Sequence, residues 1–113
     1  MLADVKNIRQ AGSPASYRKG HLMTTLLIEH RVADYDAWRE VYDSVEPVRA
    51  SSGVRSHRVL QQAGDPNHVV VEHVFADAAS AGAFMENPGL REAMGRAGVI
   101  PDSVRPLLLE DAR

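Results

Sequence analysis

The stretch that decides the fold is LLIEHRVADYDAWREVYD, residues 26–43. Its first part alternates between two faces, as residues of a β-strand do, with Leu26, Ile28 and His30 on one face. Its second part spaces aromatic residues by three and four, which is typical of an amphipathic helix. The stretch therefore predicts a buried strand over 24–32 that runs directly into a helix, which Asp34 or Asp36 can cap.

The rest of the chain predicts three more strands and two more helical segments. Pro47 lacks an N–H and should interrupt the first helix, and Gly53 should close it. Asp77 can cap a second helix, and Asn87-Pro88 restarts the chain as a short helix that ends at Gly98. The predicted strands cover 54–63, 68–75 and 103–110, and the first two are joined by a turn over 64–67.

This order, β-α-β-β-α-(α)-β, favours one arrangement. Right-handed crossovers place four antiparallel strands in a single sheet with the helices on one face, a ferredoxin-like α+β fold over residues 23–113. Residues 1–22 show no sustained period, so we predict a flexible N-terminal arm or a non-native extension. Met23 would be the natural start if these residues are an extension, and the alternative is a genuine arm that folds over a partner.

The predicted sheet leaves its second face without helices. That face would carry Leu27, Val70 and Val74 together with apolar residues of the last strand. Because an exposed apolar face of this kind usually marks an interface, we predict a homodimer formed sheet to sheet.

Composition narrows the class of protein. With 113 residues the chain is long enough for one domain, and it has no cysteine for a disulfide or a thiolate metal site, which fits a cytoplasmic protein. No apolar run approaches the roughly 18 residues of a membrane span. Residues 1–22 carry four basic residues and one acid, a charge of +3, whereas 23–113 carry nine arginines and fourteen acids, a charge of −5. The absence of a basic stripe argues against a nucleic-acid partner.

Several segments resemble a known superfamily. They are the junction at 30–38, the turn at 64–67, the strand end at 73–75 and the segment at 90–99. Together they resemble the dimeric α/β-barrel proteins related to antibiotic biosynthesis monooxygenases, many of which are labelled "cyclase". The resemblance implies this fold, a homodimer, and a ligand cavity between the sheet and its helices. The superfamily includes cofactor-free oxygenases, isomerases, haem-degrading enzymes and members without known activity, but the Asn-Trp-His set of the haem-degrading branch is not found at matching positions.

His30 and His73 are the predicted catalytic residues. Each is the polar residue on an otherwise apolar strand face, and the two strands are neighbours in this fold, so the side chains can meet on the helix side. Two neutral imidazoles in a shielded cavity can act as base and acid near neutral pH. The alternatives are two structural histidines bonded to a tyrosine or the backbone, or a divalent-metal site, for which two histidines without a third ligand make a weak set.

The remaining candidates would bind a substrate. Tyr35, Trp38 and Tyr42 form the stripe of the first helix, which is either core or the wall of a pocket for a planar ligand. Arg49 and Arg58 can hold a carboxylate or phenolate at a cavity mouth, or they are solvated surface residues. Because neighbours in a strand alternate, only one of His57 and Arg58 faces the helices.

We therefore expect a cofactor-independent monooxygenase or cyclase that acts on a hydrophobic, aromatic or polyketide-like molecule. His30 or His73 would take a proton, and Arg49 or Arg58 would stabilise the oxyanion. The alternative is a non-catalytic ligand-binding or stress-associated homodimer. An open cavity of about 300 Å³ or more that contains both imidazoles would favour the enzyme, and a closed core would favour the binding protein.

Overall fold

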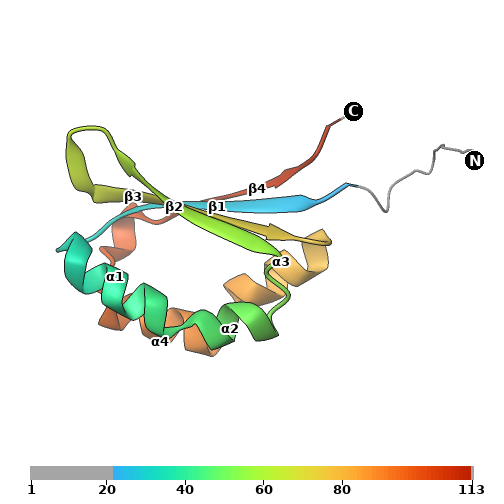
Figure 1. Cartoon of the computed structure of the whole chain (residues 1–113), viewed down its shortest axis with the longest axis horizontal. Helices are drawn as coiled ribbons and strands as arrows, with labels where there is room; N and C mark the ends of the chain where they lie inside the picture. The colour runs from blue at the N-terminus through green and yellow to red at the C-terminus, as the bar shows by residue number, and fades with distance from the viewer. Residues whose placement is uncertain (1–21, 113) are drawn as a thin grey trace, which may run out of the picture.

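A computed structural model describes residues 22–112, so the predictions for the N-terminal segment fall almost entirely outside the described residues. The chain folds as a four-stranded sheet with its helices on one side (Figure 1). The strands are β1 (Thr24–Arg31), β2 (Ser56–Gln62), β3 (Asp65–Phe75) and β4 (Arg105–Glu110). The helices are α1 (Tyr35–Ser44), α2 (Glu46–Ser51), α3 (Ala78–Met85), α4 (Pro88–Arg96) and the 3-10 turn η2 (Pro101–Ser103).

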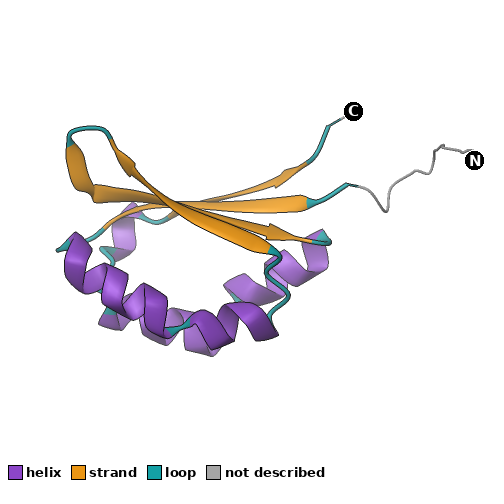
Figure 2. Ribbon diagram, viewed as in Figure 1, coloured by secondary structure: helices purple, strands orange, loops and turns teal. Residues whose placement is uncertain are grey.

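The sheet has the order β2-β3-β1-β4, and every pair of neighbours is antiparallel. Sheet and helices form two layers (Figure 2). This arrangement confirms the predicted ferredoxin-like α+β fold. No helix in residues 22–112 has the length and apolar character needed to cross a membrane.

The helix boundaries follow the local chemistry of the sequence. Asp34 caps α1 by accepting from the backbone N–H of Ala37 at 3.0 Å, and Asp77 caps α3 in the same way. Pro47 separates two helices as predicted, because its ring fits the first turn of α2, where an N–H would have no partner. Gly53 follows α2 with a φ of 85°, a conformation that glycine adopts without strain.

The hairpin between β2 and β3 differs from its prediction. The turn consists of residues 63–64 rather than 64–67, and Gln62 pairs with Asp65 across it. Gly64 has a φ of 83°, a conformation that this tight two-residue turn requires and that glycine adopts without strain. The three residues after Asp65 then bulge out of the ladder with β2, because the pairing register shifts at Gln62.

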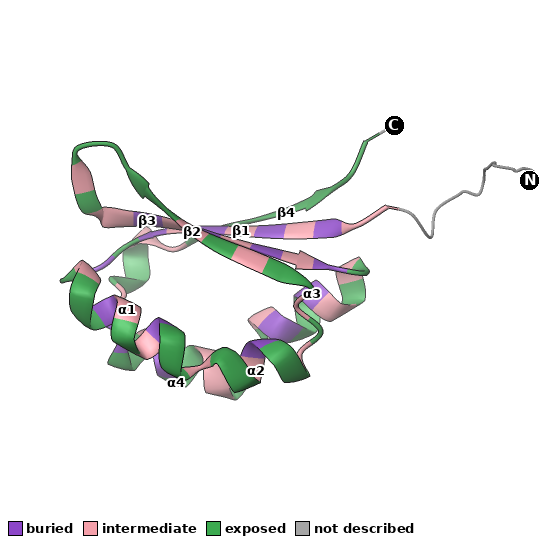
Figure 3. Ribbon diagram, viewed as in Figure 1, coloured by how far each residue is buried: buried purple, intermediate pink, exposed green. Residues whose placement is uncertain are grey.

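The core lies between the sheet and the helices in two clusters. Figure 3 marks which parts of the strands and helices are buried. One cluster joins α1 to the middle of the sheet and contains Val32, Trp38, Tyr42, Val69, Val71 and Ala97. The other joins α3 to the opposite end and contains Leu26, Ile28, Phe75, Ala81 and Phe84. The site described below lies between these clusters.

No helix among residues 22–112 covers the second face of the sheet. Leu27, Val70 and Val74 point to this face, as predicted, and are partly buried. Every residue of β4 is exposed, and Leu107 is 55% exposed. The face therefore carries an exposed apolar patch that no layer formed by residues 22–112 covers.

Candidate functional site

The site is a cavity of about 50 Å³ between the sheet and the helices. The sheet contributes Ile28 and Val71 together with both predicted catalytic residues, His30 and His73. The helices contribute Trp38, Val41, Tyr42, Val45, Val48, Arg49, Phe84, Leu90, Ala93, Met94 and Ala97. Most of the wall is apolar, so its few polar atoms determine what the cavity can bind.

The two histidines share this cavity but occupy different ends of it. In the ladder between β1 and β3, His30 is opposite Val69, whereas His73 is opposite Leu26. The pair Ile28–Val71 lies between them. The prediction that both point to the helix side is therefore consistent with the structure, but the register separates the imidazoles.

The His30 end has a satisfied hydrogen bond. His30 is 3% exposed, and its Nδ1 lies 3.2 Å from the carbonyl oxygen of Ile28, two residues earlier in the same strand. Its ring packs against Trp38 with 5.6 Å between centroids. Burial lowers the pKa of His30, and the Ile28 carbonyl opposes that shift.

The His73 end has an unsatisfied atom. His73 is also 3% exposed, and its Nδ1 has no hydrogen-bond partner among the described residues. Burial is the main reason why the pKa of His73 falls to about 3, and the charge of Arg49 adds to the effect. The imidazole is therefore neutral at physiological pH, with a buried nitrogen available to a ligand. Such an atom costs free energy unless a partner is supplied.

Arg49 places a cation on the same wall. It is 3% exposed, and its guanidinium lies 3.9 Å above the centre of the Tyr42 ring. Its Nε and Nη2 donate to Glu46 Oε1 at 3.2 and 3.0 Å. Burial raises the pKa of Tyr42, and the charge of Arg49 opposes this. Arg49 thus lines the buried cavity, where a cation stabilises an anion more strongly than in water.

His57 and Glu46 are polar neighbours of the cavity. The sequence pattern offered His57 only as an alternative to Arg58, and it did not indicate Glu46. The hydroxyl of Tyr42 lies 2.6 Å from His57 Nδ1, and Glu46 Oε1 lies 3.4 Å from His57 Nε2. Strand alternation restricts the helix-facing residue to His57 or Arg58, which is the only sequence signal for this contact. The pairing with Tyr42 depends on how α1 crosses β2.

Two predicted substrate-binding residues lie away from the cavity. Arg58 is on the open face, where its Nε donates to Glu72 Oε1 at 2.9 Å, because His57 takes the inward position. Tyr35 is at the start of α1, where it stacks on the outer side of Trp38 at 5.7 Å and its hydroxyl accepts from Arg39 at 3.3 Å. The cavity wall does not include either side chain.

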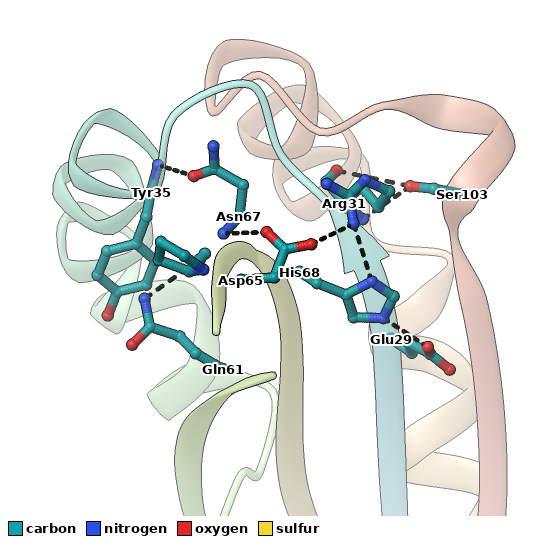
Figure 4. Close-up of polar contacts among 9 residues, drawn as sticks. Glu29, Arg31, Tyr35, Gln61, Asp65, Asn67, His68 and Ser103 are labelled. Carbon is teal, nitrogen blue, oxygen red and sulfur yellow. Dashed lines mark hydrogen bonds and ion pairs between the residues drawn. The ribbon is translucent and has the colours of Figure 1, made fainter. Parts of the chain in front are cut away.

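A separate polar cluster secures the end of β1 (Figure 4). His68 Nε2 lies 2.6 Å from Glu29, and its Nδ1 lies 3.1 Å from Arg31, which also donates to Asp65 at 2.9 Å. Asn67 accepts from the backbone N–H of Tyr35 at 2.8 Å, which fixes the hairpin against the start of α1. Across residues 22–112, no three His, Asp or Glu side chains converge in the way that metal ligands do.

Comparisons with known proteins agree with this fold. The sequence profile of the antibiotic biosynthesis monooxygenase family matches residues 28–96. Among solved structures, SnoaB, a cofactor-independent oxygenase from Streptomyces nogalater, superposes with a TM-score of 0.60 at 14% identity, over 80% of this chain and 92% of SnoaB. NE2512 from Nitrosomonas europaea, described as a protein of unknown function, gives a TM-score of 0.65 at 18% identity, over 83% of this chain and 93% of NE2512. PA3566 from Pseudomonas aeruginosa gives 0.63 at 20%, over 83% of this chain and 98% of PA3566.

These identities are low, so the likeness to solved structures concerns the fold. No curated protein matches the sequence.

Proposed function

Because the chain belongs to the antibiotic biosynthesis monooxygenase family, we propose that it is a small cofactor-independent oxygenase or cyclase. Its substrate is a hydrophobic, aromatic or polyketide-like molecule with an acidic C–H or O–H group. SnoaB supplies a precedent for oxygenation without a cofactor on this fold. Fold alone does not determine activity, so the proposal depends on the chemistry of the cavity.

The observation that carries the proposal is the unpartnered Nδ1 of His73. A buried imidazole without a hydrogen bond is unfavourable for stability, and such groups are concentrated at functional sites. A substrate hydroxyl or acidic proton would supply the missing partner. Trp38 and Tyr42 stack at 5.0 Å and offer a flat aromatic wall for a planar ring.

His73 would act as the base. Its low pKa makes it a weak base in the empty cavity, because the imidazolium is poorly solvated and lies near the charge of Arg49. The substrate anion changes this balance. It forms beside the imidazolium of His73 and the guanidinium of Arg49, and its negative charge stabilises the imidazolium. One substrate X–H bond breaks, one N–H bond forms on His73, and Arg49 stabilises the resulting oxyanion. Molecular oxygen is the oxidant in oxygenation, whereas cyclisation uses the same proton transfer without an oxidant.

Turnover of phenolic and anthrone-type compounds tests this proposal. His73→Ala should lower kcat by about 100-fold or more, because a positioned general base contributes that much. His68→Ala is the matched control, since His68 is a histidine of the same strand whose side chain lies on the open face. Equal kcat values for wild type and His73→Ala would remove His73 as the base.

The size of the cavity favours a second candidate, a ligand-binding protein without catalysis. At about 50 Å³ the cavity has room for a few water molecules and is well below the roughly 300 Å³ of typical ligand sites. A polyketide-sized substrate therefore requires the helices to move away from the sheet. Tight binding of an anthrone by the wild type without any turnover would support this candidate over the enzyme.

We also propose that the chain forms a homodimer through the open face of the sheet. Leu60, Leu107 and Leu109 are exposed there beside the partly buried Leu27, Val70 and Val74. A second copy would cover this surface and remove it from water. Analytical ultracentrifugation at micromolar concentration should give a mass of two chains, and a monomer would contradict the proposal.

A further inference from the structure

Three polar side chains form a continuous path from the cavity to the surface. The path begins at Tyr42 on the cavity wall, whose hydroxyl lies 2.6 Å from His57 Nδ1. It continues from His57 Nε2 to Glu46 Oε1 through an ion-pair contact of 3.4 Å. Exposure rises along the path, from 8% for Tyr42 to 29% for the side chain of His57 and 56% for that of Glu46. The inner end is therefore shielded from water and the outer end is in contact with it.

We propose that Tyr42, His57 and Glu46 form a proton relay that connects a ligand in the cavity with solvent. The relay extends the proposed function, and its use in catalysis rests on that proposal. His57 and Glu46 are positioning and relay residues in it, and only Tyr42 would contact the ligand.

The charges along the path determine its direction. A carboxylate can only accept, so Glu46 favours the tautomer of His57 with its proton on Nε2. Nδ1 then holds a lone pair, and the hydroxyl of Tyr42 must donate to it. This is the orientation that a base needs in order to withdraw the tyrosine proton.

Proton transfer along this path is balanced. His73 takes the proton of the reacting group, and the relay serves a second acidic group of the ligand that faces Tyr42. That group loses its proton to Tyr42 Oη as the hydroxyl proton of Tyr42 moves to His57 Nδ1. The resulting imidazolium is stabilised by Glu46 and passes its Nε2 proton to water at the exposed side. One X–H bond breaks in the ligand and one O–H bond forms in water, and each relay residue returns to its starting state after the tautomer of His57 resets.

Arg49 supports the transient charge on Tyr42. Its guanidinium lies 3.9 Å above the phenol ring and is held there by two hydrogen bonds to Glu46. A cation in that position stabilises tyrosinate, which would otherwise be strongly disfavoured by burial. Glu46 therefore serves both the relay and the placement of the cation.

Exchange of the Tyr42 hydroxyl proton with water tests the relay without any substrate. NMR at low temperature measures the exchange rate, and Tyr42→Phe identifies the resonance. His57→Gln should slow exchange by about tenfold or more, because glutamine accepts a hydrogen bond but does not take up a proton at neutral pH. Glu46→Gln should slow it less. Glu40→Gln, an exposed glutamate of the same helix as Tyr42, is the matched control and should leave the rate unchanged.

The outcomes separate the relay from the proposed function. Unchanged or faster exchange in His57→Gln overturns the relay, because a purely structural hydrogen bond protects the hydroxyl and its loss speeds exchange. Slower exchange in a protein that turns over no phenolic or anthrone-type compound supports the relay and contradicts the enzyme. Where turnover is present, His57→Ala should lower kcat with little change in KM, and added imidazole should restore it. Failure of imidazole to restore kcat overturns the catalytic use of the relay.

Discussion

His30 and His73 lie on the same face of adjacent strands and are equally buried, yet their surroundings differ. His30 has a backbone carbonyl as its partner, and the charge of Arg49 is not among the causes of its pKa shift. His73 has an unpartnered Nδ1, and the charge of Arg49 acts on it. At one end of the cavity the histidine is hydrogen-bonded to its own strand. At the other end the histidine Nδ1 has no hydrogen-bond partner among the described residues.

The difference between the two histidines indicates where the fold is less stable than it could be. An unsatisfied buried polar group costs about 1–3 kcal/mol, and a stable core would replace it by an apolar side chain. His30 can be explained by packing and one hydrogen bond, whereas His73 cannot. The incomplete end is therefore the better candidate for chemistry, and the predicted pair of catalytic histidines reduces to His73 with Arg49.

Acid should affect the His73 end most. Below the ordinary pKa of 6.5 the unfolded chain protonates His73, but the folded protein keeps it neutral down to a pKa of about 3. The unfolded state then binds more protons, so the free energy of unfolding falls as the pH falls through this window. Between about pH 7.5 and about pH 4.5, His73 should account for a loss of about 3 kcal/mol in the free energy of unfolding. Urea unfolding at these two pH values measures the loss in the free energy of unfolding.

Leucine variants of His73 and His30 compare the acid sensitivity of the two ends of the cavity. His73→Leu should remove that part of the acid sensitivity and should be at least as stable as wild type near neutral pH, since the Nδ1 of His73 has no hydrogen bond to any residue in 22–112. His30→Leu should reduce the acid-induced loss of stability by a smaller amount. Near neutral pH it should lower the free energy of unfolding by about 1 kcal/mol, because the hydrogen bond of His30 to Ile28 is lost. Similar profiles for the two variants would remove the distinction between the ends.

Local signals made most of the fold predictable. Strand alternation, the caps at Asp34, Asp77 and Asn87, and the break at Pro47 depend on residues close in sequence, and the structure contains all of them. The predicted position of the hairpin turn is wrong, because Asp65-Pro66-Asn67 has the composition of a turn. Gly64 alone supplies the positive φ that a tighter turn needs, and Asp65 then pairs within the ladder.

The candidate site was less predictable, because it depends on contacts between elements. Alternation places His30 and His73 on one face, but the offset between them is set by the register of β1 against β3. The contact between Tyr42 and His57 requires the crossing of α1 over β2, which no local pattern specifies. The missing partner of His73 is a property of packing, since a neighbouring hydroxyl or carbonyl would satisfy it without any change in the sequence pattern.

A smaller expected effect tests whether the charge of Arg49 acts on His73 and not on His30. Arg49→Met keeps an unbranched side chain and removes the guanidinium, and it leaves Glu46 at a largely exposed position where water can solvate it. The pKa of His73 should rise toward its ordinary value, because the charge of Arg49 is one of the causes that lower it. The pKa of His30 should stay where it is, because its shift comes from burial, the Ile28 carbonyl and the charge of His68. NMR titration of the imidazole resonances follows both groups in one sample.

Arg39→Met is the control for this measurement. Arg39 lies 5.4 Å from the centre of the same Tyr42 ring, but it is not among the causes of either histidine shift. It should leave both histidines unchanged, whereas an equal rise for His30 and His73 in Arg49→Met would show that the variant loosens the whole cavity. A selective rise would have a chemical consequence. His73 would become the stronger base while the cavity lost the cation that stabilises the oxyanion, so a fall in kcat despite the stronger base would show that anion stabilisation, rather than basicity, limits the reaction.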